Sequence, residues 1–162
     1  MTERILATIG ASPGRRLLGV GALVGLGVLL IWLALTTGAM PAAAVALLLV
    51  LGIAALAAAQ VMWRATALEI ILTEDELRDS AGTVLARIDE IEKVDRGMFA
   101  MKPSNGFTLL MKSPQARAWR PGLWWRMGKR VAIGGVTSGG KTRPVADILT
   151  HKVQERKQAG PN

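Results

Sequence analysis

Residues 17–63 read LLGVGALVGLGVLLIWLALTTGAMPAAAVALLLVLGIAALAAAQVMW, a stretch of 47 residues without one charged side chain. As one continuous helix this stretch would be roughly 70 Å long, at ~1.5 Å per residue. That is about twice the ~30 Å hydrocarbon core of a bilayer. The segment TTGAMP, residues 36–41, interrupts the apolar run with a glycine and a proline. The sequence therefore predicts a transmembrane helical hairpin over residues 17–63, with spans at about 17–35 and 42–63.

The charges that flank this hairpin predict its orientation. Arg4, Arg15 and Arg16 precede the first span, Arg64 follows the second, and the connecting turn carries no charge. Lysine and arginine accumulate on the cytoplasmic side of membrane proteins. We therefore expect a membrane protein with both termini in the cytoplasm, beginning with a cytoplasmic segment over residues 1–16. A cleaved signal peptide is the alternative for the first apolar run, but the run is long for such a signal and a second span follows directly.

From residue 65 onward the sequence consists of short segments typical of β-strands, separated by turn residues. Strands are predicted at residues 66–73, 76–80, 83–88, 106–112 and 130–135. Residues 143–157, RPVADILTHKVQERK, place apolar residues at helical spacing and basic residues near the end, which predicts an amphipathic C-terminal helix. The fold class is thus a two-helix transmembrane hairpin plus a small α+β domain over residues 65–157, followed by a tail at 158–162.

Two stretches of this domain carry a family resemblance. LTEDELRDSAGTVLARIDEIEKVDRG, residues 72–97, resembles the first half of bacterial pleckstrin-homology-like (PH-like) domains, which often follow a pair of transmembrane helices. NGFTLLMKSP and RAWRPGLWWRMGKRVAIGG, at 105–114 and 117–135, resemble small uncharacterised membrane proteins of alphaproteobacteria. The resemblance implies an antiparallel β-domain with a C-terminal helix. Lipid-binding PH domains use basic residues around their first strands, whereas this chain has Glu69, Glu74 and Asp75 there, so phosphoinositide binding is not expected.

The domain is divided in charge and contains one segment rich in tryptophan and arginine. Residues 69–95 hold nine acidic and three basic side chains, whereas residues 96–146 hold ten basic and none acidic. Three hypotheses compete for the Trp/Arg segment: docking on anionic headgroups, a protein interface and nucleic-acid stacking. At least one tryptophan is also expected in the core, because bulky residues are scarce. The predicted docking residues are Arg117, Trp119, Arg120, Trp124, Trp125, Arg126, Lys129 and Arg130.

Within the first span, Gly21 and Gly25 have the small-residue spacing that lets membrane helices approach closely. Gly19 and Gly27 lie in the same span, and the second span offers Gly52 among several alanines. Two interpretations remain open: the two spans simply pack on each other as a hairpin, or they pack against another membrane protein. Neither span contains an ionisable residue, which argues against a transporter, proton path or channel.

Residues 134–142, GGVTSGGKT, match the phosphate-loop pattern, but only 20 residues follow Thr142. A working phosphate loop needs a parallel sheet and a later strand ending in an acidic residue, so nucleotide binding is a remote alternative and a flexible connector is expected. His151, the only histidine, is crowded by basic residues, and there is no cysteine. We therefore expect no catalytic, metal or cofactor site.

These observations predict a non-enzymatic accessory or assembly subunit of a larger bacterial inner-membrane complex, with photosynthetic or respiratory complexes suggested by the resemblance. The alternative function is a membrane-anchored adaptor that binds anionic lipid and recruits a cytoplasmic protein through its acidic face. A nucleic-acid partner is not expected.

Overall fold

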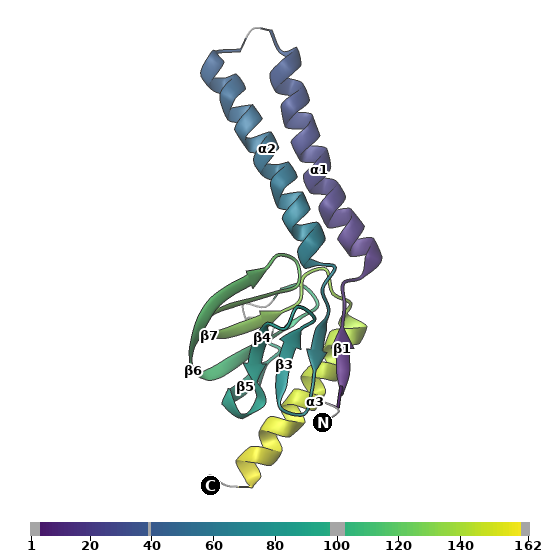
Figure 1. The fold of residues 1–162 in the computed structure, drawn as a ribbon, viewed down its shortest axis with the longest axis vertical. Coiled ribbons are helices and arrows are strands. Elements are labelled where there is room, and N and C mark those ends of the chain that lie inside the picture. The colour runs from purple at the N-terminus through teal and green to yellow at the C-terminus, as the bar shows by residue number, and fades with distance from the viewer. Residues whose placement is uncertain (1–3, 39, 98–102, 160–162) are drawn as a thin grey trace. The chain divides into compact units, whose positions relative to one another are not determined.

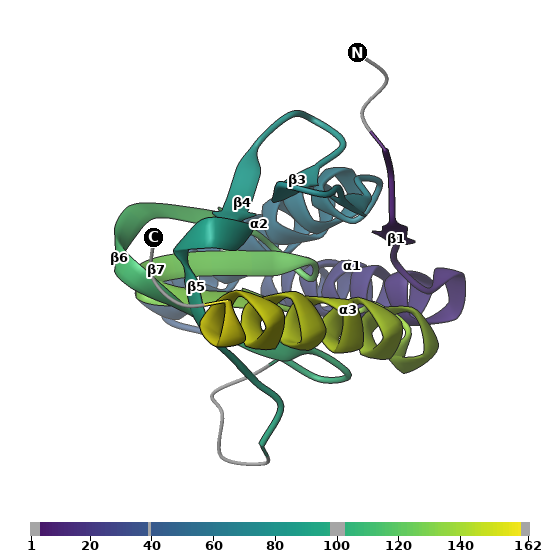
Figure 2. The same ribbon diagram turned by 90° about the horizontal axis from the view of Figure 1, so that it is seen from below.

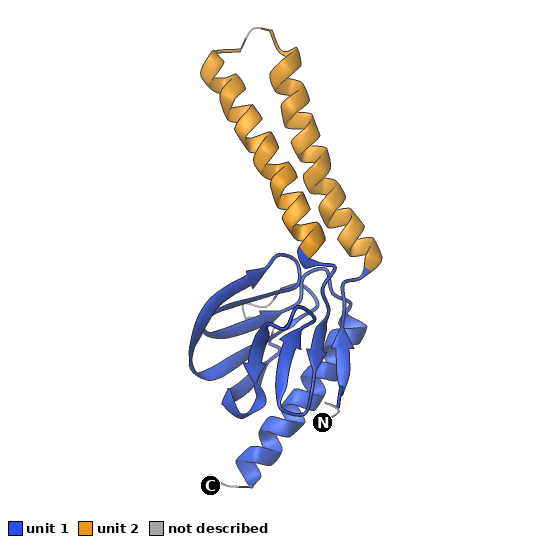
Figure 3. Ribbon diagram, viewed as in Figure 1, with its two compact units in different colours: residues 1–12, 65–162 blue, residues 13–64 orange. Residues whose placement is uncertain are grey.

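The computed structural model describes residues 4–38, 40–97 and 103–159, and these form two compact units (Figure 1 and Figure 3). Residues 13–64 form a helical hairpin. Residues 1–12 and 65–162 belong to the second unit, which we call the β domain.

The hairpin consists of α1 (Pro13–Thr36) and α2 (Ala42–Ala65), each 24 residues long. Both helices are long and apolar enough to cross a membrane. Pro13 is the first residue of α1, where its missing N–H costs nothing. The predicted spans at 17–35 and 42–63 lie inside these helices, which confirms the two-helix prediction and the break between them.

The β domain contains two antiparallel sheets and a C-terminal helix (Figure 1). The first sheet has the order β1 (Ala7–Ile9), β2 (Ile70–Leu72), β3 (Glu76–Asp79) and β4 (Val84–Arg87). The 3-10 turn η1 (Ile88–Glu90) leads to the second sheet, β5 (Ile91–Asp95), β6 (Phe107–Arg120) and β7 (Trp124–Ile133). Helix α3 (Gly139–Gln158) follows. The α+β class of this part of the chain is confirmed.

Helix α3 closes the core of the domain by packing against β1, β5 and η1; Figure 2 shows it beside β5. Its buried residues are Thr142, Val145, Ala146, Leu149 and Val153, which recur at helical spacing. They join inward-facing strand residues such as Ile70, Leu77, Leu85, Leu109 and Val131 in one hydrophobic cluster. The alternation of the strands and the period of the helix therefore supply complementary apolar faces.

The strand β1 lies before the hairpin in sequence but belongs to the β domain. Thr8 pairs with Ile71, Ile9 is fully buried, and the Ser12 N–H donates to the Val136 carbonyl at 2.8 Å. The expected division into a separate segment 1–16 and a domain 65–157 is therefore wrong, because the hairpin is inserted between the first two strands. Since both of its connectors enter one folded sheet, they must lie on the same side of any membrane that the hairpin spans.

The boundaries of other elements also differ from the predictions. The predicted strands at 106–112 and 130–135 are parts of one long hairpin, β6–β7, which also includes most of the Trp/Arg segment, to which no secondary structure was assigned from the sequence. Pro114 lies inside β6, at an interruption of the ladder between Leu110 and Gln115. Proline is tolerated there because its missing N–H is not needed for pairing. Helix α3 begins at Gly139, earlier than predicted, and extends one residue into the predicted tail.

Candidate docking surface on the β6–β7 hairpin

The β6–β7 hairpin carries the Trp/Arg segment, and it curves until its turn meets its own base. The Gly134 N–H donates to the Leu123 carbonyl and the Val136 N–H to the Gly122 carbonyl, both at 3.0 Å. The approach is close, since a Cβ on Gly135 would lie 2.7 Å from the Gly122 oxygen. The middle of the hairpin is therefore the crest of an arch, visible in the curvature of β6 and β7 in Figure 1.

Pairing register sorts the predicted docking residues onto two faces. Trp119 pairs with Trp125, and Arg120 pairs with Trp124. Paired residues share a face, and successive residues alternate between faces. Trp124 is 2% exposed and belongs to the core, whereas Trp119 is 67% exposed. One face of the hairpin thus points into the domain and the other points away from it.

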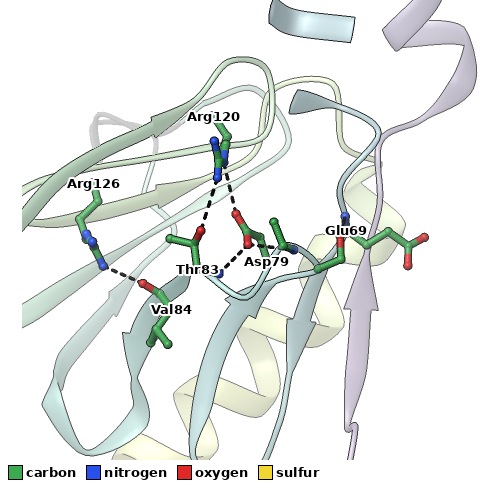
Figure 4. A network of polar contacts seen from close by, with 8 residues as sticks. Glu69, Asp79, Thr83, Val84, Arg120 and Arg126 are labelled. Carbon is green, nitrogen blue, oxygen red and sulfur yellow. Dashed lines mark hydrogen bonds and ion pairs between the residues drawn. The ribbon is translucent and has the colours of Figure 1, made fainter. Parts of the chain in front are cut away.

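The inward arginines hold the two sheets together (Figure 4). Arg120 Nε lies 3.4 Å from Asp79 Oδ2, and the carboxylate of Asp79 is fully buried. The other oxygen of that carboxylate accepts the backbone N–H groups of Ala81 and Thr83 at 3.1 and 2.8 Å. It therefore shapes the turn between β3 and β4, in agreement with the preference of Asp for turns.

Arg126 makes a second bridge between the sheets. Its Nη1 donates to the Val84 carbonyl and its Nε to the Ala116 carbonyl, both at 2.7 Å. Arg120, Trp124 and Arg126 thus have roles inside the domain. This corrects the expectation of one continuous docking segment, and it confirms that one tryptophan belongs to the core.

Of the remaining exposed or partly exposed residues of the hairpin, we group the basic, tryptophan and methionine side chains under the name outer face: Lys112, Arg117, Trp119, Trp125, Met127, Lys129 and Arg130. The exposed residues Ser113, Pro114, Ala116 and Gly128 lie among them in the chain. Met127 is 54% exposed, and Trp125 is partly exposed. Lys112 and Met127 were absent from the sequence-based set. Met127 lies two residues after Trp125 in β7, so both side chains are on the same face of the strand. This could be predicted only if the pairing of β6 with β7 were already known.

The helical hairpin uses a different glycine pair from the one predicted. A Cβ on Gly27 would lie 2.8 Å from Leu56 Cδ2 and 2.9 Å from the Gly52 carbonyl oxygen. Gly27 and Gly52 therefore bring α1 and α2 together. By contrast, a Cβ on Gly21 or Gly25 would meet nothing within 4 Å. The two spans therefore pack on each other as a hairpin, but not through Gly21 and Gly25, whose surface is left open.

At the charged end of the helical hairpin, Arg16 of α1 contacts Trp63 of α2. Arg16 donates from Nη2 to the Trp63 carbonyl at 2.9 Å, and its guanidinium carbon lies 3.8 Å from the centroid of the Trp63 ring. Arg15 is next to Arg16 and Arg64 is next to Trp63 in the sequence, so the arginines of the hairpin lie at the end where α1 begins and α2 ends.

The phosphate-loop match is built into the fold as a connector. The N–H groups of residues 134–136 already donate to backbone carbonyls. The hydroxyl of Thr142, which would bind magnesium in a phosphate loop, donates to the Asn105 carbonyl at 2.6 Å. The preceding strand, β7, pairs antiparallel with β6. The N–H groups of residues 134–136 and the hydroxyl of Thr142 are therefore occupied by contacts within the fold.

The single histidine of the chain forms a surface pair. His151 Nδ1 lies 3.3 Å from Glu155 Oε2 on an exposed face of α3. Within residues 4–38, 40–97 and 103–159, no three His, Asp or Glu side chains are grouped so that they could hold a metal ion. No protein-family model, curated protein or solved structure matches this chain.

Proposed function

We propose that this protein is a non-enzymatic accessory or assembly subunit of a larger membrane complex in the bacterial inner membrane. The observation that carries the proposal is the open surface at Gly21 and Gly25. The spans pack through Gly27 and Gly52, so the other pair of small residues is available to a helix of another protein. The resemblance to alphaproteobacterial proteins makes photosynthetic and respiratory complexes the first candidates.

The orientation proposed for the protein has both termini in the cytoplasm. The connectors of the hairpin lie on one side of the membrane, because β1 and β2 pair. Arg15, Arg16 and Arg64 flank the spans on that same side. An excess of arginine favours the cytoplasmic side, which supports the assignment of the β domain to the cytoplasm.

We further propose that the β domain is PH-like. The support is its arrangement: a four-stranded and a three-stranded antiparallel sheet, followed by a C-terminal helix that covers the core. In this chain the membrane hairpin interrupts the domain after its first strand. The fold alone implies no activity, since one architecture serves many functions.

The test is native electrophoresis of the tagged full-length chain, extracted in mild detergent, with identification of co-migrating proteins. The wild-type chain should migrate in a discrete large complex. The variant Gly21→Leu/Gly25→Leu should insert into the membrane normally but leave that complex, because two leucines would hold the partner helix away.

The matched control is Ala54→Leu/Ala58→Leu, which adds leucines with the same spacing at exposed positions of α2. It should keep the complex. Migration of the wild-type chain as a single subunit would overturn the proposal and favour the lipid-binding adaptor. Retention of the complex by the Gly21→Leu/Gly25→Leu variant would show that the open glycine surface is not the contact.

A further inference from the structure

The outer face of the β6–β7 hairpin has features that the domain itself does not use. Trp119 is 67% exposed and Met127 is 54% exposed, although the domain buries Trp124 from the same segment. Trp119 and Trp125 lie opposite each other, close to the turn that joins β6 to β7. Exposed aromatic residues gathered on one surface generally mark a contact with a partner or a membrane.

The outer face is rich in positive charge. Among the described residues, Lys112, Arg117 and Lys129 take part in none of the ion pairs. Arg120 and Arg126, in contrast, contact Asp79 and backbone carbonyls. No acidic residue occurs between residues 96 and 146, although the Glu90 carboxylate accepts from Gln115 Nε2 at 3.0 Å. The excess of basic side chains favours a partner that carries negative charge.

The size of the face distinguishes a membrane from a protein. Even with Ser113, Pro114, Ala116 and Gly128 added, the exposed residues of this two-stranded hairpin are fewer than the roughly 20–30 residues a side of a standard protein interface. Headgroup contact needs only a few indole rings at the interface and basic groups beside anionic lipids. The β domain also joins the membrane helices through two short connectors, residues 10–12 and 66–69, which keeps the local concentration of the bilayer surface high.

We propose that the outer face is a docking surface for the headgroup layer of an anionic bilayer, in which the tryptophans and Met127 enter the interface and the basic side chains bind lipid phosphates. Arg120 and Arg126 are outside this surface. The inference goes beyond the proposed function, because it requires no partner protein and holds for the purified chain in lipid alone.

The experiment uses the full-length chain in nanodiscs. Because the sequence has no cysteine, Met127→Cys can be labelled at a single position with a fluorophore. Quenching by a headgroup spin-labelled lipid then reports contact with the bilayer. Gln154→Cys, at an exposed position of α3, is the matched control. One set of discs contains equal amounts of phosphatidylglycerol and phosphatidylcholine, and the other contains phosphatidylcholine only.

The label at position 127 should be quenched in the anionic discs, and much less in the zwitterionic discs or at high salt, whereas the label at 154 should be quenched in neither. Replacing Lys112, Arg117 and Lys129 with glutamine should weaken docking about a hundredfold, at roughly fivefold per basic residue. Equal quenching at 127 and 154 in anionic discs would overturn the proposal, and so would equal quenching at 127 in both lipid mixtures. Shielding of position 127 in native membranes but not in anionic discs would identify a protein partner instead.

Discussion

Removal of the Arg120 guanidinium should destabilise the β domain, although Arg120 lies in a segment that its sequence marks as surface. The variant is Arg120→Met, which keeps an apolar stem of similar length. The guanidinium lies 3.4 Å from a carboxylate, Asp79, whose side chain is fully buried, while Arg120 itself is 40% exposed. The variant therefore leaves a buried negative charge with only two backbone N–H donors.

The expected loss lies between two limits. Breaking a fully buried ion pair costs about 3–5 kcal/mol, and an exposed pair contributes ~0.2–1 kcal/mol. Because water reaches one side of Arg120, we expect the free energy of unfolding to fall by about 2 kcal/mol. For a domain of this size that corresponds to a decrease in Tm of roughly 10 °C. The assay is thermal unfolding of the full-length chain in detergent, followed by tryptophan fluorescence.

The control is Arg117→Met, the same change in the same strand but on the outer face. It should alter the free energy of unfolding by less than ~0.5 kcal/mol, as exposed substitutions do. In the double variant Arg120→Met/Asp79→Asn, part of the loss should be recovered, because no buried charge is left unpaired. Equal Tm values for Arg120→Met and Arg117→Met would refute the structural role assigned to Arg120.

Three further predictions test the fold. Ile9→Ala should lower the free energy of unfolding of the β domain by about 2–4 kcal/mol, since a fully buried side chain is truncated. Limited proteolysis in membranes should then cleave the β domain faster than in the wild-type chain, although Ile9 precedes both spans in the sequence. Trp124→Ala should lower stability by about 3–5 kcal/mol while Trp119→Ala leaves Tm nearly unchanged, and similar Tm values would contradict the assigned faces. Thr142→Val should lower the free energy of unfolding by about 1 kcal/mol, because it removes the 2.6 Å hydrogen bond to the Asn105 carbonyl. Lys141→Gln should leave Tm unchanged in the same melting assay. A larger loss for Lys141→Gln than for Thr142→Val would show that Lys141 rather than Thr142 stabilises the start of α3.

The insertion of the hairpin into the β domain couples membrane topology to folding. β1 is made before the spans, and its partner β2 follows them. The domain can be completed only if the N-terminal segment stays on the side where residues 65–159 fold. Pairing of Ala7–Ile9 with Ile70–Leu72 thus requires both connectors to share one side, which agrees with the charge distribution around the spans.

The sequence by itself determined the features that depend on neighbouring residues. An uncharged run of 47 residues with a Gly/Pro break specifies two membrane-length helices, since apolar length is the signal. Apolar residues at helical spacing specified α3, and turn residues separated β3 from β4. In each case the periodicity of one segment sufficed to predict its structure.

Only the tertiary structure decided which of these segments meet and which faces they use. Ala7–Ile9 is too short to be recognised as a strand, and its partner lies on the far side of the spans. Gly21 and Gly27 look alike in the sequence, but the rotation of α1 against α2 brings only Gly27 into contact. In the Trp/Arg segment, Trp124 and Trp125 are neighbours, yet one is core and the other is on the outer face. That difference follows from the register of β6 and β7, which is fixed by long-range pairing and by the curvature that returns the hairpin to its own base.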